Sequence, residues 1–138
     1  MTSADTGTAG YALSTSVPRS FDETVTATRE ALVEQGFGVL TEIDIKATLK
    51  DKLDVDVADQ VILGACRPPL AYASLQAEPS IGLLLPCNVV VRSVDASTTL
   101  VEAVNPQTMV ALTDNGALQA VADEATERLT AALATLTA

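Results

Sequence analysis

The sequence predicts an α+β fold of two layers, an antiparallel sheet with helices packed on one of its faces. Three observations predict it: apolar and polar residues alternate in short segments, two long amphipathic segments are segregated from the run of strands, and a tight turn joins the last two strands as a hairpin. Long helices segregated from a hairpin-connected meander are typical of this class. We therefore expect a strand, a helix, four strands with small helical insertions, and a final long helix.

Alternation marks the expected strands, and apolar residues repeating every three or four positions mark the helices. The strands are expected at residues 11–17, 37–44, 60–66, 84–94 and 98–104. The helices are expected at residues 20–35, 45–53, 68–77, 106–112 and 115–136. Residues 1–9 are small and polar, so we expect a flexible terminus followed by a single α+β domain over residues 10–138.

Start and stop signals support the N-terminal elements. Pro18 ends the first strand, and Ser20 with Glu23 matches a capping box, whose hydroxyl and carboxylate satisfy exposed backbone amides. Gly36 is placed to stop that helix. The next helix follows from the spacing of four between Ile45 and Leu49.

The second half of the chain carries its own signals. Pro68 and Pro69 can open a helix, because a proline in the first turn loses no needed hydrogen bond. The strand at 84–94 is the most apolar, so we expect it in the centre of the sheet. A turn at residues 95–97 returns the chain as a hairpin, and Pro106 opens a short helix before the long amphipathic one.

Composition excludes several classes of function. The chain has 138 residues and a net charge of −10, which argues against binding to nucleic acid or to an anionic membrane. It has no histidine, which excludes a Ser-His-Asp triad, an imidazole base and a histidine metal ligand. Without a secretion signal or a membrane span, and with two cysteines, we expect a cytoplasmic protein with both thiols reduced.

One basic cluster stands out in this acidic chain. It comprises Lys46, Lys50 and Lys52, which aspartates surround in the sequence. Such a mixture is typical of a solvated helix face rather than of an anion site.

Both cysteines stand where an apolar strand meets a proline, and they are the main candidate site. Because the strands at 60–66 and 84–94 should pair antiparallel, Cys66 and Cys87 are expected at the same edge of the sheet. The candidate ligand or thiol site comprises Cys66, Arg67, Pro68, Pro86, Cys87 and Asn88. Any cavity at this edge should be lined by Pro68, Pro86 and Asn88.

Two interpretations of the cysteines stay open. Free cysteines are often small buried hydrophobes. Alternatively they form a reactive or metal-binding pair, in which Arg67 and the N-terminus of the following helix favour thiolate. Two sulfurs alone make a poor zinc site, and a tetrahedral Cys₄ site would need the symmetry axis of a dimer to pass beside the cysteines. We expect no metal and no cofactor. Glu42 and Asp44 are weaker candidates, since they share the outward face of their strand and such carboxylates are usually solvated.

Three motifs carry a family resemblance. Residues 36–49, GFGVLTEIDIKATL, resemble the signature GFGxLTEIDVxATL of the bacterial and archaeal domain of unknown function 302 family. The segments ILGAC at 62–66 with Pro68, and LLPCNVVV at 84–91, resemble its other motifs. Where the family usually reads Gly-Ala-Cys-Asn-Pro, this chain has Arg67 in place of the asparagine. The resemblance implies a fold like a single TATA-binding-protein-like unit, and homodimers.

These observations lead to two functional hypotheses. The first is a non-catalytic, cytoplasmic, homodimeric domain that binds a small molecule or a protein partner, without nucleic acid or membrane. The alternative is a thiol-based redox or sulfur-handling protein that uses Cys66 and Cys87. Reactivity of the two thiols would discriminate the hypotheses.

Overall fold

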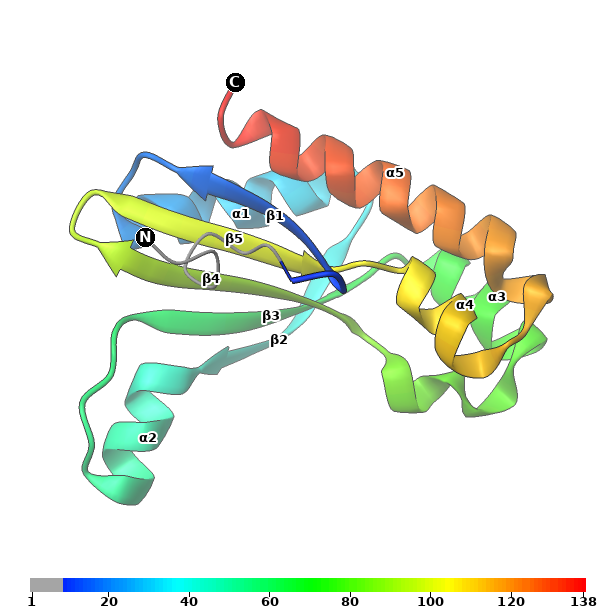
Figure 1. Ribbon diagram of the computed structural model, residues 1–138, viewed down its shortest axis with the longest axis horizontal. Coiled ribbons are helices and arrows are strands. Elements are labelled where there is room, and N and C mark those ends of the chain that lie inside the picture. Colours follow the sequence, from blue (N-terminus) through cyan, green and yellow to red (C-terminus); the bar gives the residue numbers. More distant parts are fainter. Residues whose placement is uncertain (1–8) are drawn as a thin grey trace.

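A computed structural model describes residues 9–138, which form a five-stranded antiparallel sheet with α1 and α5 on one face (Figure 1). The strands are β1 (Ala12–Val17), β2 (Gly38–Asp44), β3 (Gln60–Cys66), β4 (Cys87–Asp95) and β5 (Thr98–Val104). The helices are α1 (Phe21–Glu34), α2 (Ile45–Leu53), α3 (Pro68–Ala77), α4 (Gln107–Thr113) and α5 (Gln119–Thr135), with 3₁₀ turns η2 (Pro79–Leu84) and η3 (Gly116–Leu118). The α+β class and the order of elements are confirmed. The expectation of a flexible terminus falls mainly on residues 1–8, which lie outside the described residues.

The strand order β1-β5-β4-β3-β2 places β4 in the middle of the sheet, as its apolar sequence predicts. On the face toward α1 and α5, Leu63, Val89 and Ala103 lie opposite one another on β3, β4 and β5 and are fully buried. They pack with Leu32 of α1 and Leu129 of α5 in the main core. Burying these aliphatic side chains supplies most of the driving force that holds the two layers together.

The opposite face of the sheet carries a row of aliphatic side chains with no helix of the described chain over it. Ile43, Ile62 and Val90 are register partners on β2, β3 and β4, so their side chains point to the same side. Ile43 is 47% exposed. We call the row Ile43, Ile62 and Val90 the open-face row.

A β-bulge in β2 changes which face its residues occupy. Val39 pairs with Ala65, but Thr41 already pairs with Gly64, so one extra residue lies between them. Because side chains alternate along a strand, the extra residue turns Ile43 to the open face. Glu42 and Asp44 share a face, as expected, and both side chains are exposed; this face is the one on the side of α1, where Glu42 meets Arg29.

The strand expected from Leu84 begins only at Cys87. Residues 79–84 form η2 instead, where Ile81 is buried against Met109 of α4 and Leu118 of η3. A short continuous apolar run does not distinguish a strand from a buried helical turn. Leu85 and Pro86, joined by a cis peptide bond, connect η2 to β4.

Two helical extensions leave the sheet at opposite ends (Figure 1). At one end α3, η2, α4 and η3 gather around a second, smaller core of Ile81, Met109 and Leu118. At the other end α2 projects beside β2 and β3 and buries none of its residues. Among residues 9–138 no helix is both long and apolar enough to cross a lipid bilayer.

Candidate functional site

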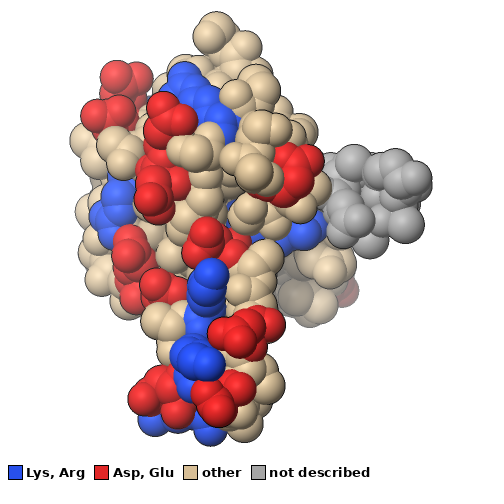
Figure 2. Space-filling view, turned by 90° about the vertical axis from the view of Figure 1, so that its left-hand side faces the viewer, with Lys and Arg blue, Asp and Glu red and all other residues tan. Residues whose placement is uncertain are grey.

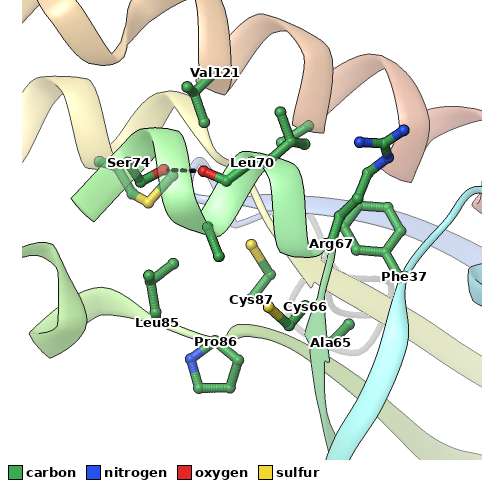
Figure 3. A pocket seen from close by; sticks show the side chains of 13 residues that line it. Phe37, Ala65, Cys66, Arg67, Leu70, Ser74, Leu85, Pro86, Cys87 and Val121 are labelled. Atoms are coloured by element: carbon green, nitrogen blue, oxygen red, sulfur yellow. Dashed lines mark hydrogen bonds between the residues drawn. The ribbon is translucent and has the colours of Figure 1, made fainter. Parts of the chain in front are cut away.

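A small cavity lies where β3 ends and β4 begins, between the sheet and helix α3, with α5 above it (Figure 3). Its volume is about 30 Å³. Most of its lining is apolar, including Phe37, Leu70 and Leu85. Cys66 and Cys87 lie beside each other at its floor. The space holds about one or two water-sized particles, far below the roughly 300 Å³ of a drug-sized site.

The antiparallel pairing of β3 and β4 brings the two cysteines together, as the sequence predicts. Ala65 is the register partner of Cys87, and Cys66 is one residue further along β3. Strand spacing and rise then place the two cysteine Cα atoms about 6 Å apart. Both are free thiols, and Cys87 is buried while Cys66 is half-buried.

Cys87 is held in its neutral form. Burial, and then a charge on the neighbouring Cys66, raise the pKa of Cys87 from 9.0 to about 11. The thiolate rather than the thiol is the nucleophile, so at neutral pH Cys87 is a poor one. The structure therefore gives Cys87 the environment of a packed or ligand-binding thiol.

The end of α1 builds one wall of the cavity. Gly36 has φ +85°, and the amides of Gly36 and Phe37 donate to the carbonyls of Val33 and Leu32, which is a Schellman motif. This turn places the ring of Phe37 at the cavity. A Cβ at Gly36 would lie 3.0 Å from Nε of Arg67, so the glycine also leaves room for that side chain.

Arg67 does not turn toward the sulfurs. Its side chain runs up toward α5, where Nη1 lies 3.6 Å from Oε2 of Glu124 (Figure 3). The same carboxylate accepts a hydrogen bond of 2.9 Å from Nε of Arg128. Two arginines thus share one carboxylate. Nε of Arg67 is a buried donor without a hydrogen-bond partner in the described part of the chain.

The N-terminus of α3 offers no free amide to a thiolate. Pro68 and Pro69 have no N–H, and the next two amides, of Leu70 and Ala71, both donate to the carbonyl of Arg67. The expectation that Arg67 and this helix end would favour thiolate is therefore wrong for Cys87, whose pKa moves upward.

Of the three residues expected to line the cavity, only one does so. Pro86 lines it, but Pro68 and Asn88 do not, so that expectation for the lining was wrong for two of its three residues. Pro68 opens α3 on the surface. Asn88 is exposed because it alternates with Cys87 and Val89 and so points to the open face.

Glu42 and Asp44, the weaker candidates, stabilise local structure. Glu42 pairs with Arg29 of α1. Asp44 caps α2 by accepting a hydrogen bond of 2.9 Å from the amide of Ala47. These partners give each carboxylate a role in local structure, and the two side chains are not arranged around a common cleft.

The lysine cluster on α2 is matched by acidic side chains. Nζ of Lys50 lies 2.9 Å from Asp54 and 3.5 Å from Asp56, and Lys46 pairs with Asp59. Figure 2 shows these basic and acidic groups intermixed over the projecting helix. The cluster is a solvated face, as expected, and its exposed ion pairs contribute little stability.

Sequence reasoning missed Met109, which lines the cavity from α4. No signal in the sequence links Met109 to the cysteines, because α4 reaches them only after it docks beside α3 and α5. Among residues 9–138 no three His, Cys, Asp or Glu side chains form a group that could hold a metal ion.

Comparison with known proteins is informative about family and fold. A family model described as "Domain of unknown function DUF302" matches residues 13–136. An experimental structure, the "Crystal structure of uncharacterized conserved protein DUF302 from Bacillus stearothermophilus", superposes with a TM-score of 0.83 at 30% identity. The match covers 91% of this chain and 98% of that one. No curated protein matches this chain.

Proposed function

Since the chain belongs to the family of the domain of unknown function DUF302, whose description names no activity, we propose a function from its own geometry. The protein is a non-catalytic binding domain that holds a small ligand in the cavity at the end of β3 and β4. The observation that carries this proposal is the enclosure of one buried and one half-buried thiol in an otherwise largely apolar cavity of about 30 Å³.

The polar groups at the cavity are occupied in ways that suit binding more than catalysis. The hydroxyl of Ser74 donates to the carbonyl of Leu70 at 2.7 Å. Arg67 is paired with Glu124 outside the cavity. A general base would need a free acceptor beside the ligand, and the high pKa of Cys87 makes its thiol a weak candidate.

Native mass spectrometry of the protein as isolated from cells tests the proposal. We expect a mass excess of a few heavy atoms per chain in the wild type. In Ala71→Leu, which fills the cavity from α3, the excess should disappear. The control is Ala73→Leu, an alanine on the same helix that does not line the cavity, and it should keep the excess. A bare chain mass in the wild type would refute the proposal.

We also propose that the protein is a cytoplasmic homodimer whose subunits meet through the open-face row, and that its fold is a TATA-binding-protein-like unit. The sheet exposes Ile43 at 47% on the face that carries no helix of the described chain, beside its register partner Ile62. Pairing two such faces would remove this aliphatic surface from water, which is the driving force of most association. Most soluble oligomers are symmetric assemblies of identical chains, so a second copy of this chain is the expected partner.

A thiol-based redox or sulfur-handling function is the second candidate. The proximity of Cys66 and Cys87 favours it. The buried and neutral state of Cys87 counts against it, because reactive cysteines are exposed and have lowered pKa values. Titration with a thiol reagent separates the two: two fast native thiols at pH 7 support redox chemistry, and a slow Cys87 supports binding.

A further inference from the structure

Three of the four sulfur-containing residues of this chain line one cavity. The chain has two cysteines and two methionines, and Cys66, Cys87 and Met109 all line the space at the end of the sheet. They arrive from the end of β3, the start of β4 and α4, which lie far apart in the sequence. The remaining sulfur belongs to Met1. The cavity therefore offers two thiols and a thioether to an occupant of very small size.

We propose that Cys66 and Cys87 bind one Cu(I) ion in this cavity, with the thioether of Met109 as an additional ligand. This inference rests on the proposed binding function and names its ligand. Thiolate and thioether are soft ligands that select Cu(I), whereas Mg²⁺ and Ca²⁺ take oxygen ligands. Structural zinc needs four protein ligands, and the described residues bring no third Cys, His, Asp or Glu to this place.

The charges balance around such an ion. Cu(I) forms a bond to each cysteine sulfur, and each thiol releases its proton to solvent, so the bis-thiolate complex carries one net negative charge. Arg67 lines the same cavity, and its Nε is a buried donor without a partner among the described residues. Arg67 and Arg128 share the single carboxylate of Glu124, so this cluster keeps one net positive charge beside the cavity, which compensates the complex without a contact to the sulfurs. A metal ion stabilises the thiolate directly, so the raised pKa of the Cys87 thiol does not prevent binding.

The rest of the lining suits Cu(I) as well. Phe37, Leu70 and Leu85 surround the sulfurs with apolar groups. An apolar shell of this kind controls solvent access to a metal site. The volume of about 30 Å³ fits a bare ion held by side chains, and not an organic cofactor.

Anaerobic competition with the chromophoric Cu(I)–bicinchoninate complex tests the proposal on the reduced wild-type protein. We expect one equivalent of Cu(I) to move to each chain. Cys66→Ser and Cys87→Ser should each weaken the affinity more than the roughly 10–100-fold typical of a group that only supports a ligand. Met109→Leu and Arg67→Gln should weaken it within that range. Ala73→Leu, on the same helix but outside the cavity lining, should leave the affinity unchanged.

The pH dependence of the affinity and the choice of variants add to this test. The affinity should fall as pH falls, because two protons compete with the ion. Cys66 is half-buried and Met109→Leu conserves volume, so these variants remain informative if Cys87→Ser fails to fold. The proposal is overturned if the wild type leaves Cu(I) with bicinchoninate, or if Cys66→Ser competes as well as the wild type. A mass excess that Ala71→Leu removes, without Cu(I) transfer, would overturn only copper and leave the binding function standing.

Discussion

The side chain of Arg67 lies in the space that Gly36 leaves by having no Cβ. A Cβ built on Gly36 would be 3.0 Å from Nε of Arg67, and the glycine itself has φ +85°. The turn that ends α1 and the strand end that carries the candidate site are therefore fitted to each other. Gly36 is constrained both by its positive φ and by the neighbouring side chain of Arg67, and substitutions at these two positions distinguish the two effects.

Gly36→Ala should lower the free energy of unfolding by about 1–3 kcal/mol, because an alanine at positive φ is strained. Arg67 has a flexible side chain that can shift, so most of this cost should persist in the Arg67→Ala background. Gly36→Asn should cost less, since asparagine tolerates the left-handed region. Urea unfolding checks these values, with Gly82→Ala as the control, because nothing lies within 4 Å of a Cβ there. If Gly36→Ala no longer lowers the free energy of unfolding in the Arg67→Ala background, the loss comes from the clash with Arg67 and not from backbone strain.

Gly64 of β3 leaves room for Thr41 of β2 and for Pro86 at the entry to β4. A Cβ there would collide with Oγ1 of Thr41 and lie 2.9 Å from Cγ of Pro86. Gly64→Ala should destabilise the protein by about 1–3 kcal/mol through overpacking. Adding Thr41→Ala should recover part of that loss, since one of the two collisions disappears. Thermal unfolding of the single and double variants measures this, and an unchanged midpoint in Gly64→Ala would refute it.

Cys87→Ser should lower the free energy of unfolding by about 1–3 kcal/mol, because it buries a hydroxyl in an apolar place. Cys66→Ser should cost less, since Cys66 is only half-buried. Chemical denaturation of the two variants side by side checks the order. Equal losses of stability in the two variants would contradict the prediction that the more buried cysteine is the more costly one to replace.

The raised pKa of Cys87 predicts a loss of stability at high pH. In the unfolded chain the thiol ionises near pH 9.0, but in the folded protein its pKa is about 11. Between these values the folded state binds more protons, so stability falls as pH rises. The stabilisation is fully present below pH 9.0 and is lost through about pH 11, with a size on the order of 2–3 kcal/mol.

Comparison with Cys87→Ala isolates this contribution from the lysines and tyrosines that titrate in the same range. The stability difference between wild type and variant should shrink from pH 8 to pH 11. A difference that stays constant over this window would show that the thiol ionises equally in both states.

Self-association through the open-face row predicts a mass of twice 14.3 kDa by light scattering at micromolar concentration. Ile43→Lys places a charge on the 47% exposed face of β2 and should yield monomers. The control is Val33→Lys on α1, where the valine is 64% exposed, and it should leave the dimer intact. A monomeric wild type would refute the dimer, and a dimeric Ile43→Lys would move the interface elsewhere.

Local signals in the sequence determined most elements of this fold. Ser20 begins α1 with a hydrogen bond from the amide of Glu23, and Gly36 ends it, because capping depends on a few adjacent residues. The meander order of the strands makes β3 and β4 antiparallel neighbours, so the approach of Cys66 to Cys87 could be predicted as well. The face of Ile43 could not, since a single extra residue in β2 reverses the alternation and leaves no mark in the sequence.

Tertiary packing alone decided the chemistry of the candidate site. Met109 lines the same cavity as the cysteines because α4 docks against α5, which no local pattern encodes. Arg67 pairs with Glu124, more than fifty residues away, and so turns from the thiols that adjacent sequence suggested it would serve. The pKa of Cys87 rises because the folded chain removes water from around it. Burial is a property of the whole fold, and the sequence near Cys87 specifies only that a strand begins there.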